Sequence, residues 1–157
     1  FIVIVRPHPR TCKLNPNLIS MIEEEFESNE NFTLEIDITN TASLFNSNLL
    51  ISDWSGIAME YAFSCERPVV FIDVPKKLNN PEADRISIIP IEKSVREKIG
   101  VVVSPESLSE LPQIIKKMSI NQEKWTKEIK HLRKEYVYNL GRSAVIGAEN
   151  ILRILRR

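Results

Sequence analysis

Five short apolar runs, separated by segments with helical periodicity, constrain the fold of this chain more than any other feature. The runs cover residues 1–5, 33–38, 49–52, 69–74 and 101–104. The first, Phe1–Val5, is continuously apolar and mostly β-branched, which is typical of a strand buried on both faces of a parallel sheet. Alternating strands and helices predict an α/β fold with one parallel sheet and helices on both of its faces.

The segments between the runs carry the signals of helices. Asn15 and Pro16 predict an N-cap and first turn, and Leu18, Ile19, Ile22 and Phe26 follow on one helical face. Other helices are expected over residues 41–46, 55–64, 91–98 and 108–118. A longer helix is expected through residues 125–136 with Gly141 at its end, and Ser143 is expected to cap the last helix, whose apolar face is Ala144, Ala148, Ile151 and Leu155. A polar stretch that contains proline is expected over residues 76–90, between the fourth run and the helix that follows.

Length and composition limit the classes of protein to which this chain can belong. The 157 residues suit one domain, 1–157, whose segment 120–157 holds the C-terminal helices. Lys plus Arg is 21 and Asp plus Glu is 21, which argues against a general nucleic-acid binder. Two cysteines, Cys12 and Cys65, are too few for a disulfide scaffold and indicate reduced thiols, as in a cytoplasm. The chain begins at Phe1, inside the first apolar run, so we expect it to be part of a longer protein.

The neutral total hides a segregation of charge. Residues 116–157 contain 11 Lys and Arg against 4 Asp and Glu, a balance of +7, so the preceding residues carry −7. The last helix ends in the basic, apolar segment Leu152–Arg157. A solvated helical face is the simpler explanation of this pattern.

The loop after the first run is a candidate anion site. Arg6-Pro-His-Pro-Arg10 places Arg6, His8 and Arg10 beside two prolines that end the strand. In open parallel sheets, ligands bind beyond the carboxyl ends of the strands. His8 could donate to a phosphate or transfer a proton near neutral pH. The alternative is a solvated loop that happens to be basic.

The loop after the third run is the second candidate. Ser52-Asp53-Trp54-Ser55-Gly56 follows the run and opens a predicted helix. Free N–H groups at a helix N-terminus, the hydroxyl of Ser55 and the small Gly56 would together hold a phosphate. Capping by Asp53 or Ser55 would explain the same residues without a ligand. If all the strands share one sheet, both loops lie at the same edge.

Two further candidates are weaker, and several familiar sites are missing from the sequence. Asp73 ends the fourth run and could face the same edge, and Glu60 could reach a cleft from its helix. Neither cysteine has a histidine nearby in sequence, so no thiol nucleophile is predicted. The sequence shows no metal-ligand cluster, no glycine-rich dinucleotide fingerprint and no P-loop, so no metal or cofactor is predicted.

These motifs resemble those of a known family. Arg6-Pro-His-Pro9, then Leu50-Ile-Ser-Asp-Trp-Ser-Gly-Ile57 and Glu66-Arg-Pro-Val-Val-Phe71, resemble the CDP-glycerol glycerophosphotransferases of teichoic-acid and capsule synthesis. The similarity covers about residues 1–75 and is looser in the C-terminal helices. It implies a Rossmann-like domain, the C-terminal donor-binding half of a GT-B fold. An N-terminal GT-B domain of the same chain would be its partner.

The resemblance also implies roles for single residues. His8 would act at the donor pyrophosphate. Asp53, Ser55 and Gly56 would lie at the helix that receives the donor phosphates. Ser52 beside them, and Arg6 and Arg10 of the basic loop, complete the expected phosphate-binding residues, since positive groups stabilise the charge of the leaving nucleotide. Trp54 stands where the family has tyrosine, and Gly56 stands where it has a second serine. The donor would be CDP-glycerol or a similar nucleotide-activated polyol phosphate. The base that activates the acceptor would lie in the other half.

Other functions fit parts of the sequence. A GT-B glycosyltransferase or an epimerase-like enzyme with a UDP-sugar would use the same sheet edge. A phospho-receiver would use Asp53, but it needs an acidic cluster after the first strand, where this chain has Arg6-Pro-His-Pro-Arg10. A non-catalytic binding module is the third alternative. Because the family's acceptors are lipid-linked, the basic C-terminal helix could lie at an anionic membrane surface, which would make the protein cytoplasmic and peripheral.

Overall fold

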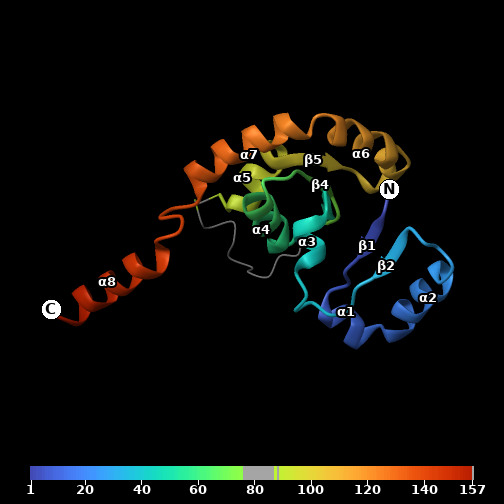
Figure 1. Cartoon of the computed structure of the whole chain (residues 1–157), viewed down its shortest axis with the longest axis horizontal. Helices are drawn as coiled ribbons and strands as arrows, with labels where there is room; N and C mark the ends of the chain where they lie inside the picture. Colours follow the sequence, from blue (N-terminus) through green and yellow to red (C-terminus); the bar gives the residue numbers. More distant parts are fainter. Residues whose placement is uncertain (76–86, 88, 157) are drawn as a thin grey trace. The chain divides into compact units, whose positions relative to one another are not determined.

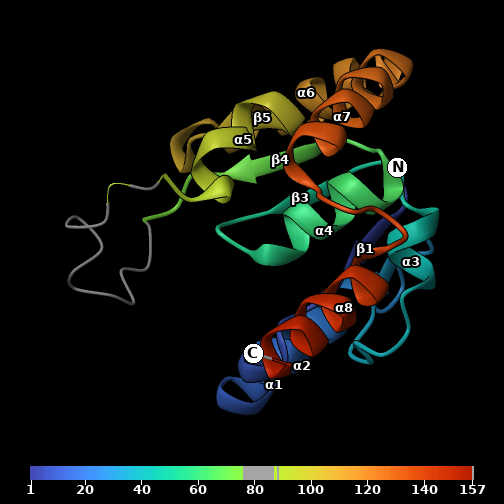
Figure 2. The ribbon, with the colours of Figure 1, turned by 90° about the vertical axis from the view of Figure 1, so that its left-hand side faces the viewer.

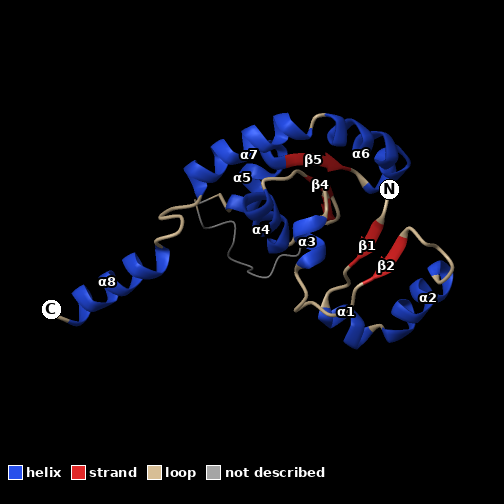
Figure 3. Cartoon of the chain, viewed as in Figure 1, coloured by secondary structure: helices blue, strands red, loops and turns tan. Residues whose placement is uncertain are grey.

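The protein has an α/β architecture in which short parallel strands alternate with helices (Figure 3). The computed structural model describes residues 1–75, 87 and 89–156. The predicted α/β class with parallel strands flanked by helices is confirmed. The sequence predicted one domain with one sheet. The chain instead divides into two compact units, Phe1–Ser47 and Asn48–Arg157, and its strands form two parallel sheets.

The first unit contains a two-stranded parallel sheet and three helices (Figure 1). Its elements are β1 (Val3–Val5), α1 (Pro9–Leu14), α2 (Pro16–Phe26), β2 (Phe32–Leu34) and α3 (Ala42–Asn46). Strand β1 pairs with β2 so that Ile4 lies opposite Thr33. Phe26 of α2 stacks on Phe32 of β2 with 4.5 Å between the ring centroids, and Ile19 of α2 is buried. These contacts hold α2 against the small sheet.

Strand β1 is far more exposed than its sequence predicted. The expectation was a strand buried on both faces, but Phe1 and Ile2 are each 74% exposed and Val3 is 50% exposed. The physical reason is the size of the sheet, because two strands and three short helices cannot enclose an apolar run on both faces. Of the hydrophobic side chains described in this unit, Ile19 alone is buried.

Strand β2 ends earlier than predicted, at Leu34 rather than at residue 38. The N–H and the hydroxyl of Thr39 both donate to Asp37 Oδ1, at 2.9 and 2.6 Å. These hydrogen bonds lower the pKa of Asp37, the bond from the hydroxyl having the larger effect. A carboxylate bonded to the backbone two residues ahead is a turn motif, and it competes with continued strand pairing.

The second unit contains a three-stranded parallel sheet in the order β3-β4-β5. Val70 lies opposite Ile51 on one side and Val101 on the other. The elements are β3 (Leu50–Ser52), α4 (Gly56–Cys65), β4 (Val69–Ile72), α5 (Ile91–Ile99), β5 (Gly100–Val103), a 3-10 helix (Pro105–Glu110), α6 (Leu111–Ile120), α7 (Gln122–Tyr136) and α8 (Ser143–Leu155). The runs that predicted these three strands are confirmed as strands.

Helices cover both faces of this sheet, as the sequence predicted. On one face, Val70 and Val103 pack with Met118 of α6. On the other face, Phe71 lies against Arg96 of α5, and α4, which contacts β3, α5 and α7, adds further buried residues. Figure 2 shows α4 and α6 on opposite sides of the three strands. The core of the unit is therefore centred on β4, whose Val69, Val70 and Phe71 are at most 1% exposed.

Glu66 fixes α7 to the C-terminal end of α4. It ends α4 in the left-handed region (φ 56°), which few residues other than glycine adopt. Its carboxylate pairs with Lys130 at 3.0 Å and with Arg133 at 2.7 Å. Arg133 also donates to the carbonyl of Phe63 at 3.0 Å. Two cations thus lie at the negative end of the α4 dipole, where positive charge is favourable.

Several predicted helix ends were wrong. Helix α6 begins at Leu111 rather than Leu108, after the 3-10 helix, although Pro112 does lie in its first turn. Helix α7 ends at Tyr136, and Gly141 lies five residues beyond it in a turn (φ 74°). The N-cap of α8 is Arg142, while Ser143 Oγ donates to the carbonyl of Asn139 at 3.0 Å. A polar stretch was expected over residues 76–90. Residues 76–86 and 88 of this stretch lie outside the described residues.

Helix α8 has no buried residue. The face predicted to be its apolar side, Ala144, Ala148, Ile151 and Leu155, is exposed. None of the helices in the described part of the chain has the length and hydropathy that a membrane span requires.

Candidate functional site

The candidate site of the second unit begins where β3 passes into α4. Strand β3 ends at Ser52, and Ser55 is the N-cap residue of α4. The Ser55 side chain makes no capping hydrogen bond, although its carbonyl accepts the N–H of Ala58 at 3.2 Å. Simple capping by a side chain was the ligand-free explanation of this motif, and it does not occur here. Among the residues that the structure describes, no side chain therefore accepts the first N–H groups of α4, which lie beyond the carboxyl end of β3.

Trp54 anchors this loop to the neighbouring strand. Its indole N–H donates to the carbonyl of Val74, just beyond β4, at 2.9 Å. The guanidinium of Arg96 lies over the same indole ring, 3.7 Å from its centroid. Contact at this distance allows a cation–π interaction, and together the two contacts fix the loop that precedes Ser55.

Asp73 lies at the same edge, as the sequence predicted. It follows β4 directly, and its Oδ1 accepts a hydrogen bond from Arg96 Nη1 at 3.0 Å. The carboxylate is half exposed, whereas the Arg96 side chain is only 7% exposed. The structure thus brings Trp54, Asp73 and Arg96 together at the ends of two neighbouring strands.

The sequence motifs did not single out Arg96. Its signal was its place in the helix over residues 91–99, three residues before the buried Ile99 and one after the buried Val95. Residues three apart share a helix face, so a charged residue stood on the side that predicts burial. A buried arginine needs a partner, and this pattern could have prompted a search for one.

The remaining candidates of this unit differ in exposure. Ser52 is half-buried at the end of β3, and Asp53 and Gly56 are exposed. Glu60 lies exposed about one turn into α4. Ser52, Asp53, Ser55 and Gly56 share the loop and the first turn, while Glu60 lies farther along the helix.

In the first unit, His8 is the N-cap residue of α1. Its Nδ1 accepts the N–H of Arg10 at 3.0 Å. A ring nitrogen that accepts a hydrogen bond carries no proton, so neutral His8 holds its proton on Nε2. Both His8 and Arg10 are exposed. The loop therefore offers an N–H donor on an imidazole and an exposed guanidinium.

Arg6 has a structural role that the sequence did not predict. Its guanidinium forms an ion pair with Glu35, and Nη1 also donates to Asn40 O at 2.7 Å and to Ser43 Oγ at 2.6 Å. Ser43 in turn donates to Glu35 at 2.5 Å. Arg6 thus ties the chain after β2 to the end of β1. Its partners lie 29 to 37 residues away, so no local pattern could have indicated them.

The thiol of Cys65 is not an activated nucleophile. Burial raises the pKa of Cys65, and the opposing effect of Arg67 is smaller. Such a thiol stays protonated at neutral pH, whereas the reactive form is the thiolate. Among the residues that the structure describes, no three His, Cys, Asp or Glu side chains group as a metal site would require.

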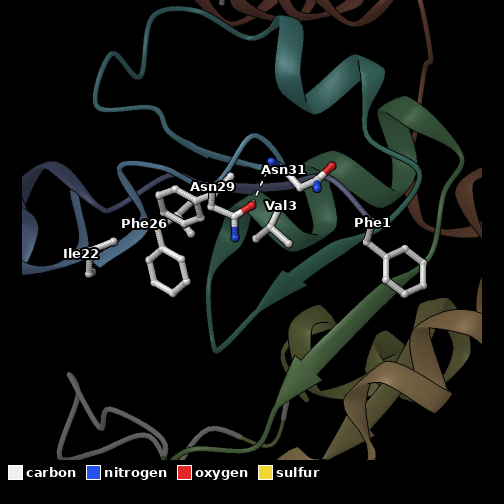
Figure 4. Close-up of a pocket in the computed structure, with 8 residues that line it drawn as sticks. Phe1, Val3, Ile22, Phe26, Asn29 and Asn31 are labelled. Atoms are coloured by element: carbon white, nitrogen blue, oxygen red, sulfur yellow. Dashed lines mark hydrogen bonds between the residues drawn. The ribbon is translucent and has the colours of Figure 1, made fainter. Parts of the chain in front are cut away.

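The first unit also has an apolar hollow of about 450 Å³ beside β1. Its lining comes from the chain start and β1, from α2, and from β2 with the turn before it: Phe1, Val3, Val5, Ile22, Phe26, Asn29, Asn31 and Phe32 (Figure 4). None of the candidate site residues lines it. The hollow marks the face of β1 that two strands leave uncovered and adds no reactive group to the site.

Comparisons with protein-family models, with curated proteins and with solved structures find no match to this chain. The ligand of this chain is therefore inferred from the groups at the edge of the β3-β4-β5 sheet and from the resemblance of the chain's motifs to those of the family named above.

Proposed function

We propose that this chain is the donor-binding domain of a transferase. It would move glycerol phosphate, or a related polyol phosphate, from a CDP-activated donor to a cell-surface polymer. The domain would be the C-terminal half of a GT-B enzyme, with an N-terminal domain of the same chain as its partner. The observation that carries the proposal is the N-terminus of α4, which begins beyond the carboxyl end of β3 with no side-chain cap. Such an N-terminus favours an anion, and the donor is a diphosphate ester.

The reaction concentrates negative charge on the leaving nucleotide. A hydroxyl oxygen of the acceptor attacks the phosphorus next to glycerol, the bond from that phosphorus to the bridging oxygen breaks, and CMP leaves with the electron pair. The N–H groups of α4 and the hydroxyl of Ser55 would donate to the donor phosphates. The resemblance of the motifs implies that His8, through Nε2–H, acts at the donor pyrophosphate, and Arg10 would add positive charge beside it. Donors aimed at developing charge are a major source of catalysis. The base that takes the acceptor proton is assigned to the N-terminal domain.

A binding experiment separates this donor from its closest rival. Isothermal titration of the 157-residue chain with CDP-glycerol, CDP-ribitol and UDP-glucose is expected to show binding of a CDP compound. Ser55→Ala should weaken that binding about 10-fold or more, since a hydrogen bond to a charged group contributes about 1.5–3 kcal/mol. Ser64→Ala, an exposed serine at the other end of α4, is the matched control and should bind as the wild type does.

The outcomes of this titration have distinct meanings. Binding of UDP-glucose alone would replace the proposal with a UDP-sugar glycosyltransferase or epimerase-like enzyme. No binding of any of the three nucleotides would overturn the donor-binding role.

A separate experiment addresses the receiver alternative. Labelling of Asp53 by acetyl phosphate would support a receiver domain in place of the donor-binding role.

We further propose that the protein acts in the cytoplasm, at the inner face of the membrane, with α8 as the contact. Val145, Leu152 and Leu155 of α8 are at least 52% exposed. Arg142, Arg153 and Arg156, in α8 or directly beside it, are exposed as well. A basic amphipathic helix with an uncovered apolar face favours anionic lipid.

Vesicle sedimentation tests this contact. The chain is expected to sediment with phosphatidylglycerol vesicles more than with phosphatidylcholine vesicles, and Leu155→Glu should abolish the difference. Ser119→Glu adds the same charge at an exposed position of α6 and serves as the control. Equal sedimentation with both vesicles, or with neither, would contradict the membrane role.

A further inference from the structure

Arg96 is a buried cation, and three of its five N–H donors have no hydrogen-bond partner among the described residues. It is the single charged residue among the described residues that is buried, at 6% exposure. Neither its Nε nor its Nη2 has a hydrogen-bond partner in the part of the chain that the structure describes. Unpaired donors on a buried charge are unfavourable, because the group has lost its water without a replacement. Their presence beside a candidate site points to a ligand.

The other contacts of the guanidinium determine which part of it is free. Nη1 donates to Asp73 at 3.0 Å. One face of the group lies on Trp54, and Phe71 lies 4.9 Å from it. The remaining edge carries the N–H groups of Nε and Nη2, which are parallel and lie in the guanidinium plane. This pair of donors matches two oxygens of one phosphate or carboxylate group.

The place of Arg96 beside the Trp54 loop indicates which anion it would take. Arg96 stacks on Trp54, and Ser55 and the first turn of α4 follow Trp54 in the chain. The helix N-terminus and the guanidinium thus offer two sets of N–H donors at the ends of neighbouring strands. Asp73 neutralises part of the charge of Arg96, but it occupies only Nη1. A ligand with two linked phosphates fits two sets of donors better than a single phosphate does.

We propose that the Nε–Nη2 edge of Arg96 binds one phosphate of a nucleoside diphosphate, whose other phosphate lies at the N-terminus of α4. This inference deepens the proposed function and rests on it, because it assigns a further residue to the same donor site. Arg96 then has two roles. It fixes the Trp54 loop through stacking, and it recognises the diphosphate through its free edge.

A purely structural Arg96 would hold Trp54 without touching the ligand, and a conservative variant separates the two roles. Arg96→Lys keeps the positive charge beside Asp73 and Trp54, but an ammonium cannot present two parallel N–H donors. It is expected to weaken binding of CDP and of inorganic pyrophosphate about 10-fold or more, because bidentate charge-assisted bonds are the stronger kind. Lys93→Gln removes a charge from an exposed position of the same helix and should leave both affinities within about twofold, as expected for a screened surface charge.

A measurement on the unaltered chain keeps the inference testable even if Arg96→Lys folds poorly. In protein with ¹⁵N-labelled arginine, the Nε–H resonance of Arg96 is assigned with the help of the variant. Addition of pyrophosphate should shift this resonance and slow its exchange with water. The Nε–H resonance of Arg142, exposed before α8, is the internal control and should not move.

The outcomes distinguish this inference from the proposed function. If CDP binds and Ser55→Ala weakens it, but Arg96→Lys and the Arg96 resonance show no change, then Arg96 is structural and the donor site stands without it. If neither CDP nor pyrophosphate binds to the wild-type chain, both proposals fail. Weakened binding in Arg96→Lys together with a shifted resonance supports both.

Discussion

Replacing Gly100 with alanine is expected to disrupt the β3-β4-β5 sheet more than any other single methyl addition to a glycine of this chain. A Cβ at position 100 would lie 1.8 Å from the carbonyl oxygen of Val69 and 2.7 Å from its carbonyl carbon. Val69 is fully buried and pairs with Gly100 across the β4–β5 ladder. Because the obstacle is backbone in a central strand, it cannot move aside as a flexible side chain could. We expect a loss of about 3 kcal/mol or more in the free energy of unfolding.

Gly147→Ala is the matched control for this substitution. An added Cβ at position 147 meets nothing within 4 Å, and the residue lies inside α8. Alanine should favour that helix by about 0.8–1 kcal/mol. Urea unfolding followed by circular dichroism measures both variants. If the urea midpoint of Gly100→Ala equals that of the wild type, then β4 and β5 do not approach each other as closely at Gly100 as the structure shows.

The sequence predicted those elements that local patterns determine. Strands β3, β4 and β5 are short runs such as Val69–Ile72, which are too apolar for a solvated loop and too short for a helix. Helix α4 follows from the loop residues at its start and from the apolar residues that it buries. Errors of a few residues arose where the deciding contact was a turn, as at Thr39 after β2, or a 3-10 helix, as before α6.

The partners of charged residues could not be predicted from the sequence. Arg6 was expected to bind phosphate because it lies in a basic loop, but its ion pair with Glu35 depends on how β1 and β2 pair. Arg96 was overlooked because its relation to Trp54 and Asp73 exists only when α5 packs on the sheet. The candidate loop Ser52–Gly56 could be found, since strand, loop and helix are contiguous. The burial of Arg96 also left a local signal, but its place beside this loop could not be predicted, because it comes from a helix some 40 residues later.

Replacing His8 is expected to have the largest effect on activity. In the two-domain transferase proposed above, His8→Ala should lower turnover about 10²- to 10⁴-fold, the range for loss of a group that transfers or shares a proton in the transition state. The physical reason is the Nε2 proton, which the Nδ1 contact with Arg10 leaves available to a phosphate oxygen. The measurement is the rate of CMP release at saturating CDP-glycerol and acceptor.

His8→Asn separates this chemical role from the structural one. His8 also caps α1, and loss of a cap costs about 1 kcal/mol of stability. Asparagine caps helices well through its side-chain oxygen, but it has no ring nitrogen to donate or transfer a proton at this site. His8→Asn should therefore keep the wild-type thermal unfolding midpoint and still lose turnover as fully as His8→Ala. If the asparagine variant recovers wild-type turnover, His8 acts only as a cap and has no part in the transfer.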